Sequence, residues 1–275
     1  MSLAAVAQIT STSNILKNAK ICKDLIAEAA SKGAKCVFFP EASDYIAHNS
    51  SEALELSRHP DCSAFVKQIC AEAKQHSIYV QIGVHEPSSF ENKLLNSSLL
   101  IVPDKGIVQR YNKAHLFDVD IANGPVLKES NSTVPGNAIL PPFETPLGKV
   151  GSAICFDLRF PEHALKLRNM GADIITYPSA FTQKTGAAHW EVLLRARALD
   201  AQSYIFAAAQ GGSHNEKRAS YGHAMIVDPW GTTIAQYSDL ASPNGLIFAN
   251  IELNLVEHVR KFIPLLRRND LYPVI

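Results

Sequence analysis

The chemistry available to this sequence is clearest at one cysteine, Cys155. Residues 150–155 (VGSAIC) are apolar enough for a buried strand, and the polar segment 156–162 (FDLRFPE) follows directly. Ligands collect beyond the carboxyl ends of strands in layered α/β folds, and a strand-to-helix turn leaves backbone N–H groups free for an oxyanion. Because a free thiol has a pKa near ~8.5, a nucleophilic one needs a base or a cation nearby. We therefore predict that Cys155 is a nucleophile, with a small buried side chain as the alternative.

Two further residues could assist a thiol. Glu41 follows the apolar run CVFFP, so it is either a base at the rim of a sheet or a solvated loop acid. Lys113 lies in RYNKAHLFD, after the strand-like run 97–102 and the turn PDKG. Its composition is that of a surface amine, and the sequence alone does not bring it near Cys155.

Alternating strands and helices must position these residues, which indicates a layered α/β fold. The helix at 14–32 is the clearest, with Ser13 or Asn14 as its N-cap and Gly33 after its end. Apolar runs of strand length lie at 3–9, 35–39, 78–84, 97–102, 149–155, 173–177, 204–209, 223–227 and 246–251. The other expected helices are 62–76, 161–170, 188–202 and 255–263, and 85–96 and 117–148 are expected to be loops. We expect a single domain over residues 1–275.

Composition excludes several classes of function. Lys plus Arg and Asp plus Glu number 26 each, and no basic stripe appears, so neither nucleic acid nor an anionic membrane is expected as a main partner. No apolar run reaches the roughly 18 residues that a membrane span needs. The N-terminus MSLAAVAQIT has no leader-like pattern, which favours the cytoplasm.

The cysteines argue against a disulfide framework or a metal centre. They number five, and no pair has the spacing C-x-x-C. We expect reduced thiols, and buried packing roles for Cys22, Cys36, Cys62 and Cys70.

Taken together, FPEAS, YNKAHLFD and CFDLRFPE resemble the nitrilase superfamily of carbon–nitrogen hydrolases, which is marked by a Glu-Lys-Cys triad in that chain order. The resemblance runs from AVAQI at 5–9 to DLYP at 270–273. It implies a four-layer α-β-β-α sandwich, subunits paired as a homodimer or higher homo-oligomer, and catalysis by Glu41, Lys113 and Cys155 without metal or organic cofactor. It also implies a second glutamate, here Glu129 in LKESNSTVPG, which local composition would equally explain as a loop acid.

Within the superfamily, ESNSTVPG, TYPSAF, GAAHWEVLLRARA and EKRASYGHAMIVDPWG are most similar to the branch that hydrolyses the terminal amide of deaminated glutathione. The main alternative is an ω-amidase, which acts on α-ketoglutaramate and α-ketosuccinamate. Both groups of substrates carry a 2-oxo acid head and a terminal amide. A true nitrilase fits the segments less well, and a non-catalytic interaction protein on this fold would be favoured by a missing Glu, Lys or Cys.

By the same resemblance, the substrate pocket would be lined by Tyr45, Phe156, Arg159, Phe181 and Thr185, with the backbone N–H of Phe156 helping Lys113 to bind the oxyanion. The Arg159 guanidinium suits a carboxylate, and a structural salt bridge with Glu162 or Asp157 is a close rival. Core packing is nearly as good an explanation for Phe181.

Helix 188–202 and the polar stretch 214–223 could border this pocket. Trp190 is expected to be a packing anchor, His189 stays undecided, and the stripe Val192, Leu193, Ala196 and Leu199 is expected in the core or at a subunit interface. Glu216, Lys217 and Arg218 are expected on a solvated face or at the mouth of the pocket.

Overall fold

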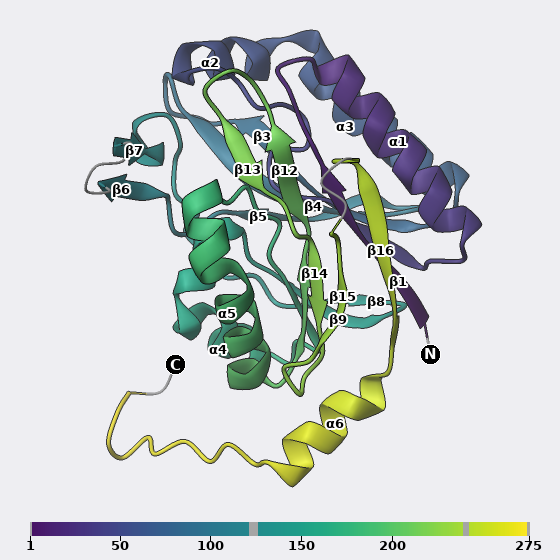
Figure 1. Ribbon diagram of the computed structural model, residues 1–275, viewed down its shortest axis with the longest axis vertical. Coiled ribbons are helices and arrows are strands. Elements are labelled where there is room, and N and C mark those ends of the chain that lie inside the picture. The colour runs from purple at the N-terminus through teal and green to yellow at the C-terminus, as the bar shows by residue number, and fades with distance from the viewer. Residues whose placement is uncertain (1, 121–125, 239–241, 274–275) are drawn as a thin grey trace.

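The computed structural model describes residues 2–120, 126–238 and 242–273 (Figure 1). Its helices are α1 Ile15–Ser31, α2 Ser50–Arg58, α3 Pro60–Gln75, α4 Pro161–Asn169, α5 Gln183–Ala201 and α6 Leu253–Phe262, with the short 3₁₀ turns η1 Glu129–Asn131 and η2 Cys155–Arg159. Its strands are β1 Ser2–Ile9, β2 Cys36–Phe38, β3 Tyr79–Pro87, β4 Leu94–Val102, β5 Gly106–Asn112, β6 Asp118–Asp120, β7 Val126–Lys128, β8 Phe143–Thr145, β9 Gly148–Ser152, β10 Ile174–Thr176, β11 Tyr204–Ala207, β12 Ala209–Ser213, β13 Ala219–Tyr221, β14 Met225–Val227, β15 Thr233–Gln236 and β16 Gly245–Ile251.

Two mixed sheets form the centre of the molecule. The first has the order β13-β12-β1-β2-β3-β4-β5, with β16 also paired to β1, and the second has the order β15-β14-β11-β10-β9-β8. Strands β1, β2 and β3 are parallel, as are β9, β10 and β11. Parallel neighbours require crossover connections, which here contain α1 and α3 in the first sheet and α4 and α5 in the second. The carboxyl ends of β2 and β9 lead to the two segments that carry Glu41 and Cys155.

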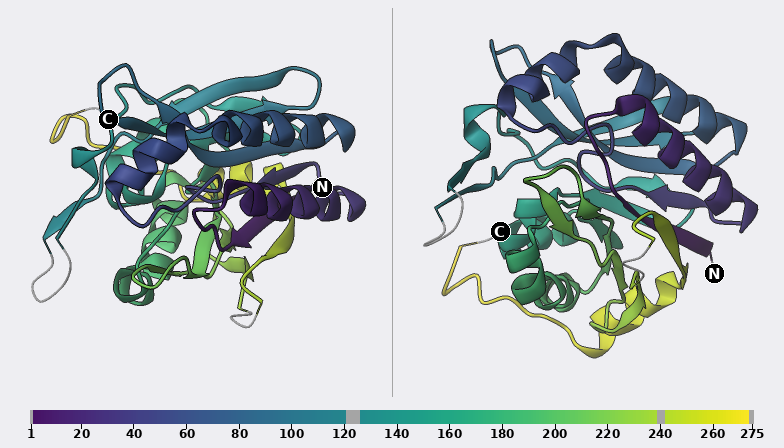
Figure 2. Two further views of the ribbon diagram at one scale, coloured as in Figure 1. Left: turned by 90° about the horizontal axis from the view of Figure 1, so that it is seen from above. Right: turned by 45° about the horizontal axis from the view of Figure 1, so that its top comes forward.

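Alternating residues of the central strands face different cores, which produces four layers. In β1, Ala4 and Val6 belong to the core between the sheets, whereas Ala5 and Ala7 belong to the core beneath α1 and α3. The inter-sheet core continues to the inner faces of α4 and α5, and Phe38 meets Phe206 edge-on across it at 4.9 Å. Figure 2 shows the helices outside the sheets. The expected α-β-β-α sandwich is confirmed.

Each strand expected from an apolar run is present, and each expected helix is present with ends shifted by a few residues. Asn14 is the N-cap of α1, and its side chain accepts a hydrogen bond from Lys17 N at 2.9 Å. Helix α2 and strands β5, β8, β13 and β15 were not predicted, because they are short, half-exposed or rich in polar residues. The expected loop 117–148 contains β6, β7, η1 and β8, and its residues 121–125 lie outside the described residues.

Among the helices of the described ranges, none combines the length and the apolar character that crossing a lipid bilayer requires.

Candidate active site

Glu41 lies in a buried loop that begins at the end of β2. Gln210 holds this loop, because its Nε2 donates to the carbonyl oxygens of Glu41 and Ala42 at 2.9 and 3.1 Å. Gly83 of β3 is equally important, since a Cβ there would lie 2.6 Å from the Cα of Glu41. Close approach of the two backbones therefore places the Glu41 carboxylate against the end of the sheet.

Lys113 follows β5 and is almost completely buried, with a side chain that is 2% exposed. Its Nζ lies 2.9 Å from Glu41 Oε1 and 2.8 Å from Glu129 Oε2. Burying an ammonium is costly unless it is paired and hydrogen-bonded, and here two carboxylates meet both needs. The surface position that composition suggested for Lys113 is therefore wrong.

Asn96, in β4, joins the two glutamates and was missed by the sequence analysis. Its Nδ2 donates to Glu41 Oε1 at 2.7 Å and to Glu129 Oε1 at 3.1 Å. Glu129 Oε2 also accepts from Phe117 N at 2.7 Å, which fixes the carboxylate against Lys113. The only trace of this role in the sequence is a polar residue within the apolar run LLNSSLLIV.

Cys155 begins the η2 turn directly beyond β9, and the structure brings it to the same cluster. Its φ of 45° lies in the left-handed region, and its backbone N–H donates to Pro178 O at 3.0 Å. The thiol lies near enough to the Glu41 carboxylate and the Lys113 ammonium for both charges to act on it, and the backbone N–H of Ala180 donates to Glu41 Oε2 at 3.0 Å. A strained turn thus presents the sulfur to the carboxylate.

The charges in this cluster shift the pKa values of its members in a consistent way. Burial alone would raise the pKa of Glu41, but the charge of Lys113 and hydrogen bonds from Lys113 and Asn96 hold it below the ordinary value. Burial would lower the pKa of Lys113, but the charges of Glu129 and Glu41 raise it well above the ordinary value. Burial and the charge of Glu41 raise the pKa of the Cys155 thiol. A charged base therefore faces a protonated thiol before any substrate binds.

A cavity of about 240 Å³ opens above the Cys155 sulfur. It is lined by Phe117, Cys155, Phe156, Arg159, Ala180, Phe181, Thr182 and Thr185, so four of the five expected pocket residues border it. A larger hollow, lined by His115, Ile139, Phe160, Glu162, His163 and Lys166, contains no nucleophile.

Arg159 reaches this cavity as an unpaired cation. Within the described ranges it makes no ion pair, so the expected alternative of a salt bridge with Glu162 or Asp157 is absent. Its guanidinium lies over the rings of Phe156 and Phe181 at 5.7 and 5.8 Å, and Nη2 lies 3.1 Å from His189 Nδ1. Phe181 also packs on Trp190, so it both lines the cavity and belongs to the core.

Tyr45 does not border the cavity. Its ring is fully buried in the core beneath α1 and α3, where it stacks on His85. Its hydroxyl donates to Ala53 O at 2.9 Å, which leaves no donor for a substrate. These contacts identify Tyr45 as a packing residue, and the expectation that it lines the pocket does not hold in this structure.

The remaining segments near the pocket are partly as expected. Trp190 is a buried anchor whose indole N–H donates to His223 O. Helix α5 buries Leu194, Arg197, Ala198 and Ala201, whereas Val192 and Leu199 of the expected apolar stripe face solvent. Glu216, Lys217 and Arg218 are exposed.

Comparisons with known proteins point to one family. A sequence model described as "Carbon-nitrogen hydrolase" matches residues 3–261. The chain is 74% identical to "Probable hydrolase nit2" of Schizosaccharomyces pombe, with all of both chains covered, and 48% identical to "Deaminated glutathione amidase" of Mus musculus, covering 98% of this chain and 84% of that one. The solved structure of the Caenorhabditis elegans NitFhit protein matches with a TM-score of 0.92 and 41% identity, covering 98% of this chain and 66% of that one.

Proposed function

Since this chain belongs to the carbon–nitrogen hydrolase family and is an amidase-type hydrolase, we propose that it hydrolyses the terminal amide of deaminated glutathione. The observation that carries the proposal is the buried Glu41–Lys113 pair, 2.9 Å apart, beside Cys155 in the wall of the cavity. The proposed nucleophile is therefore the sulfur, and the intermediate is a thioester. The substrate follows from the similarity to the mouse deaminated glutathione amidase.

The first half of the reaction forms the thioester. Glu41 takes the thiol proton, and the sulfur of Cys155 attacks the amide carbon. Lys113 and the backbone N–H of Phe156 bind the developing oxyanion; within the described ranges this N–H has no acceptor of its own. The C–N bond then breaks, and protonated Glu41 gives its proton to the departing amine, which is cysteinylglycine for deaminated glutathione and ammonia for a primary amide such as α-ketoglutaramate. Each oxyanion donor in such a site contributes about 10²–10³-fold in rate.

The second half releases the acid. Glu41 takes a proton from water, the water oxygen attacks the thioester carbon, and the C–S bond breaks to restore the thiol. Protonated Glu41 returns its proton to the sulfur, so one amide and one water yield one carboxylic acid and one amine: cysteinylglycine from deaminated glutathione, or ammonia from a primary amide. Glu129 keeps Lys113 charged and oriented throughout, because its Oε2 accepts a second hydrogen bond from Nζ, at 2.8 Å. Neither metal nor organic cofactor enters these steps.

Arg159 is the proposed binding group for the carboxylate of the 2-oxo acid head. It is a cation without an acidic partner at the cavity that contains the nucleophile, and guanidinium binds carboxylate in a two-pronged geometry. In this proposal the 2-oxo-amide head occupies the cavity beside Cys155, and the cysteinylglycine tail extends into the mouth of the pocket.

A substrate comparison with the wild type and Arg159→Gln tests this proposal. We expect hydrolysis of deaminated glutathione to exceed that of α-ketoglutaramate and of hexanamide, measured as kcat/KM from the appearance of each carboxylic acid. Loss of a hydrogen bond to a charged group costs about 1.5–3 kcal/mol, so Arg159→Gln should raise KM for both anionic amides by about 10–100-fold. Hexanamide carries no carboxylate, so its KM should stay within about threefold.

Arg110→Gln is the matched control, because it removes an equal charge from a surface arginine that pairs with Glu86. Arg110→Gln should leave KM and kcat/KM unchanged for all three substrates. A higher kcat/KM for α-ketoglutaramate would identify an ω-amidase instead, and hydrolysis of nitriles alone would identify a true nitrilase. Equal effects of Arg159→Gln on charged and neutral amides would show that Arg159 is structural.

We also propose that the chain forms a homodimer through the outer face of α5. Val192 and Leu199 are 69% and 52% exposed, and Trp230 is 57% exposed. The backbone next to Trp230 lies against Leu199, because a Cβ on the adjacent Gly231 would lie 2.9 Å from the Leu199 side chain. Large apolar side chains grouped in this way mark interaction surfaces. Sedimentation equilibrium should give twice the chain mass; a monomer at micromolar concentration would contradict the proposal.

A further inference from the structure

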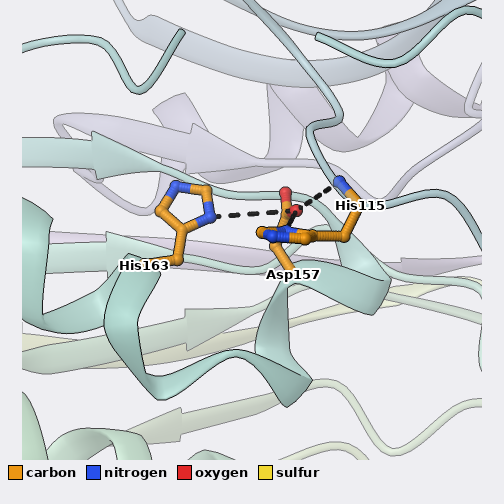
Figure 3. Close-up of side chains that lie close together, drawn as sticks. All are labelled: His115, Asp157 and His163. Atoms are coloured by element: carbon orange, nitrogen blue, oxygen red, sulfur yellow. Dashed lines mark hydrogen bonds and ion pairs between the residues drawn. The ribbon is translucent and has the colours of Figure 1, made fainter. Parts of the chain in front are cut away.

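One buried carboxylate, that of Asp157, receives hydrogen bonds from two separate segments of the chain. Its Oδ2 accepts from Ile154 N at 2.9 Å and from the Tyr111 hydroxyl at 2.7 Å. Its Oδ1 accepts from His115 N at 3.0 Å and from His115 Nδ1 at 2.7 Å. Figure 3 shows the carboxylate of Asp157 close to the side chains of both His115 and His163.

These donors flank the two reacting side chains that the proposed mechanism needs. Ile154 immediately precedes Cys155, whereas Tyr111 and His115 lie two residues before and two residues after Lys113. The Tyr111 hydroxyl also accepts from Ala114 N at 3.2 Å, which adds a tie within the lysine segment. Asp157 therefore connects the turn that carries the sulfur to the segment that carries the ammonium.

The surroundings of Asp157 favour a fixed, ionised carboxylate. Burial would raise the pKa of Asp157, but hydrogen bonds from His115 and from the Tyr111 hydroxyl hold it below the ordinary value. His163 is 1% exposed, and its Nδ1 lies 3.8 Å from Asp157 Oδ1. His115 stacks on Phe160 with ring centroids 3.6 Å apart, which locks the donor ring in place.

The same three side chains are of types that bind metals, but their spacing is that of a hydrogen-bond network. His115 Nδ1 and Asp157 Oδ1 are 2.7 Å apart. Two ligands that share a zinc ion at about 2.0–2.2 Å lie roughly 3 Å or more apart. The short contact therefore identifies a proton between nitrogen and oxygen.

We propose that Asp157 is a positioning residue that sets the placement of the Cys155 sulfur relative to the Lys113 ammonium. The proposal rests on the function proposed above, in which sulfur attacks and the ammonium binds the oxyanion. Asp157 itself does not border the cavity and touches no reacting atom. Its effect reaches the reaction only through the two segments that it ties together.

Kinetics of Asp157→Asn test this role. Asparagine keeps the shape, but its NH₂ group must face either the Ile154 and Tyr111 donors or the His115 donors. Misplacement of a reacting group by about 1 Å costs on the order of 10²-fold, so kcat should fall about 100-fold while KM stays within about threefold. Alkylation of Cys155 by iodoacetamide needs no oxyanion donor, so its rate should change by less than about threefold. Equal losses in both reactions would overturn the proposal, because they would indicate general damage to the thiol.

Tyr111→Phe provides a second, milder test, and Tyr177→Phe is its matched control. Both tyrosines are fully buried, but within the described ranges the Tyr177 hydroxyl has no hydrogen-bond partner. We expect kcat to fall about 10-fold in Tyr111→Phe and to stay within about twofold in Tyr177→Phe. If Asp157→Asn fails to fold, this pair decides alone, and equal kcat values would overturn the proposal.

A double variant shows whether Tyr111 acts through Asp157. Residues in one hydrogen-bond network have non-additive effects. The kcat of the double variant, Asp157→Asn with Tyr111→Phe, should therefore lie within about twofold of the kcat of Asp157→Asn alone. Full additivity would contradict the connection. Failure of the proposed function is separately visible, because it would appear as turnover by a protein that lacks Cys155, whatever the Asp157 variants do.

Discussion

Replacing Cys155 with alanine is expected to abolish hydrolysis while leaving the fold intact. The sulfur is the atom that forms the thioester, and the rest of the cluster cannot substitute for it. Loss of a nucleophile costs on the order of 10⁴–10⁶-fold in kcat in enzymes of comparable design, so turnover should fall below detection. Little stability should be lost, because the side chain is small and lies at the edge of the cavity. Release of cysteinylglycine from deaminated glutathione and the Tm of both proteins are the measurements.

Cys70→Ala is the matched control for this variant. Cys70 is likewise a free thiol, but it lies on α3 and is only partly buried. Its loss should leave kcat and KM unchanged. Turnover of Cys155→Ala within tenfold of the parent would remove the sulfur from the mechanism, and with it the proposed thioester.

Glu41→Gln is expected to lower kcat about 10²–10⁴-fold, the range that general acid–base catalysis contributes. Glutamine retains the shape of glutamate and can still accept from Asn96 and Lys113, but it cannot take the thiol proton. Lys113 keeps its pairing with Glu129, so the buried ammonium is not left alone. Single-turnover kinetics should show slow acylation of Cys155, and Glu86→Gln, which alters a surface carboxylate paired with Arg110, should have no effect.

The pH dependence of this variant has a definite sign. The pKa of Glu41 is lower in the folded protein than its ordinary value, so the wild type should keep an ionised base through mildly acidic pH. Glu41 thus contributes stability above its unfolded pKa of about 4.3, and that contribution is lost as pH falls through the lower folded pKa. As pH falls, the Glu41→Gln variant should lose less unfolding free energy than the wild type does. A kcat within threefold of the wild type would exclude Glu41 as the base. An unchanged loss of unfolding free energy at acid pH would contradict the lowered pKa of Glu41.

Much of the fold could be predicted because its information is local. The alternation in β1 and the continuous apolar runs of β2, β10 and β11 follow from burial on both faces of a sheet, and the cap of α1 follows from Asn14. The short strands of the loop regions were missed, because three-residue pairings leave almost no periodicity to detect.

The resemblance of the segments around Glu41, Lys113 and Cys155 to the nitrilase superfamily was sufficient to indicate an amidase-type hydrolase from the sequence. Their contacts depend on chain crossovers and strand pairing: Glu41 and Lys113 are 72 positions apart and meet at 2.9 Å only because their strands belong to one sheet. Burial of Tyr45, the lack of an acidic partner for Arg159, and the roles of Asn96 and Asp157 were likewise decided by tertiary structure. The residue type determines which hydrogen bonds a side chain can donate or accept. The residues that bury the side chain and form those hydrogen bonds come from distant segments of the chain.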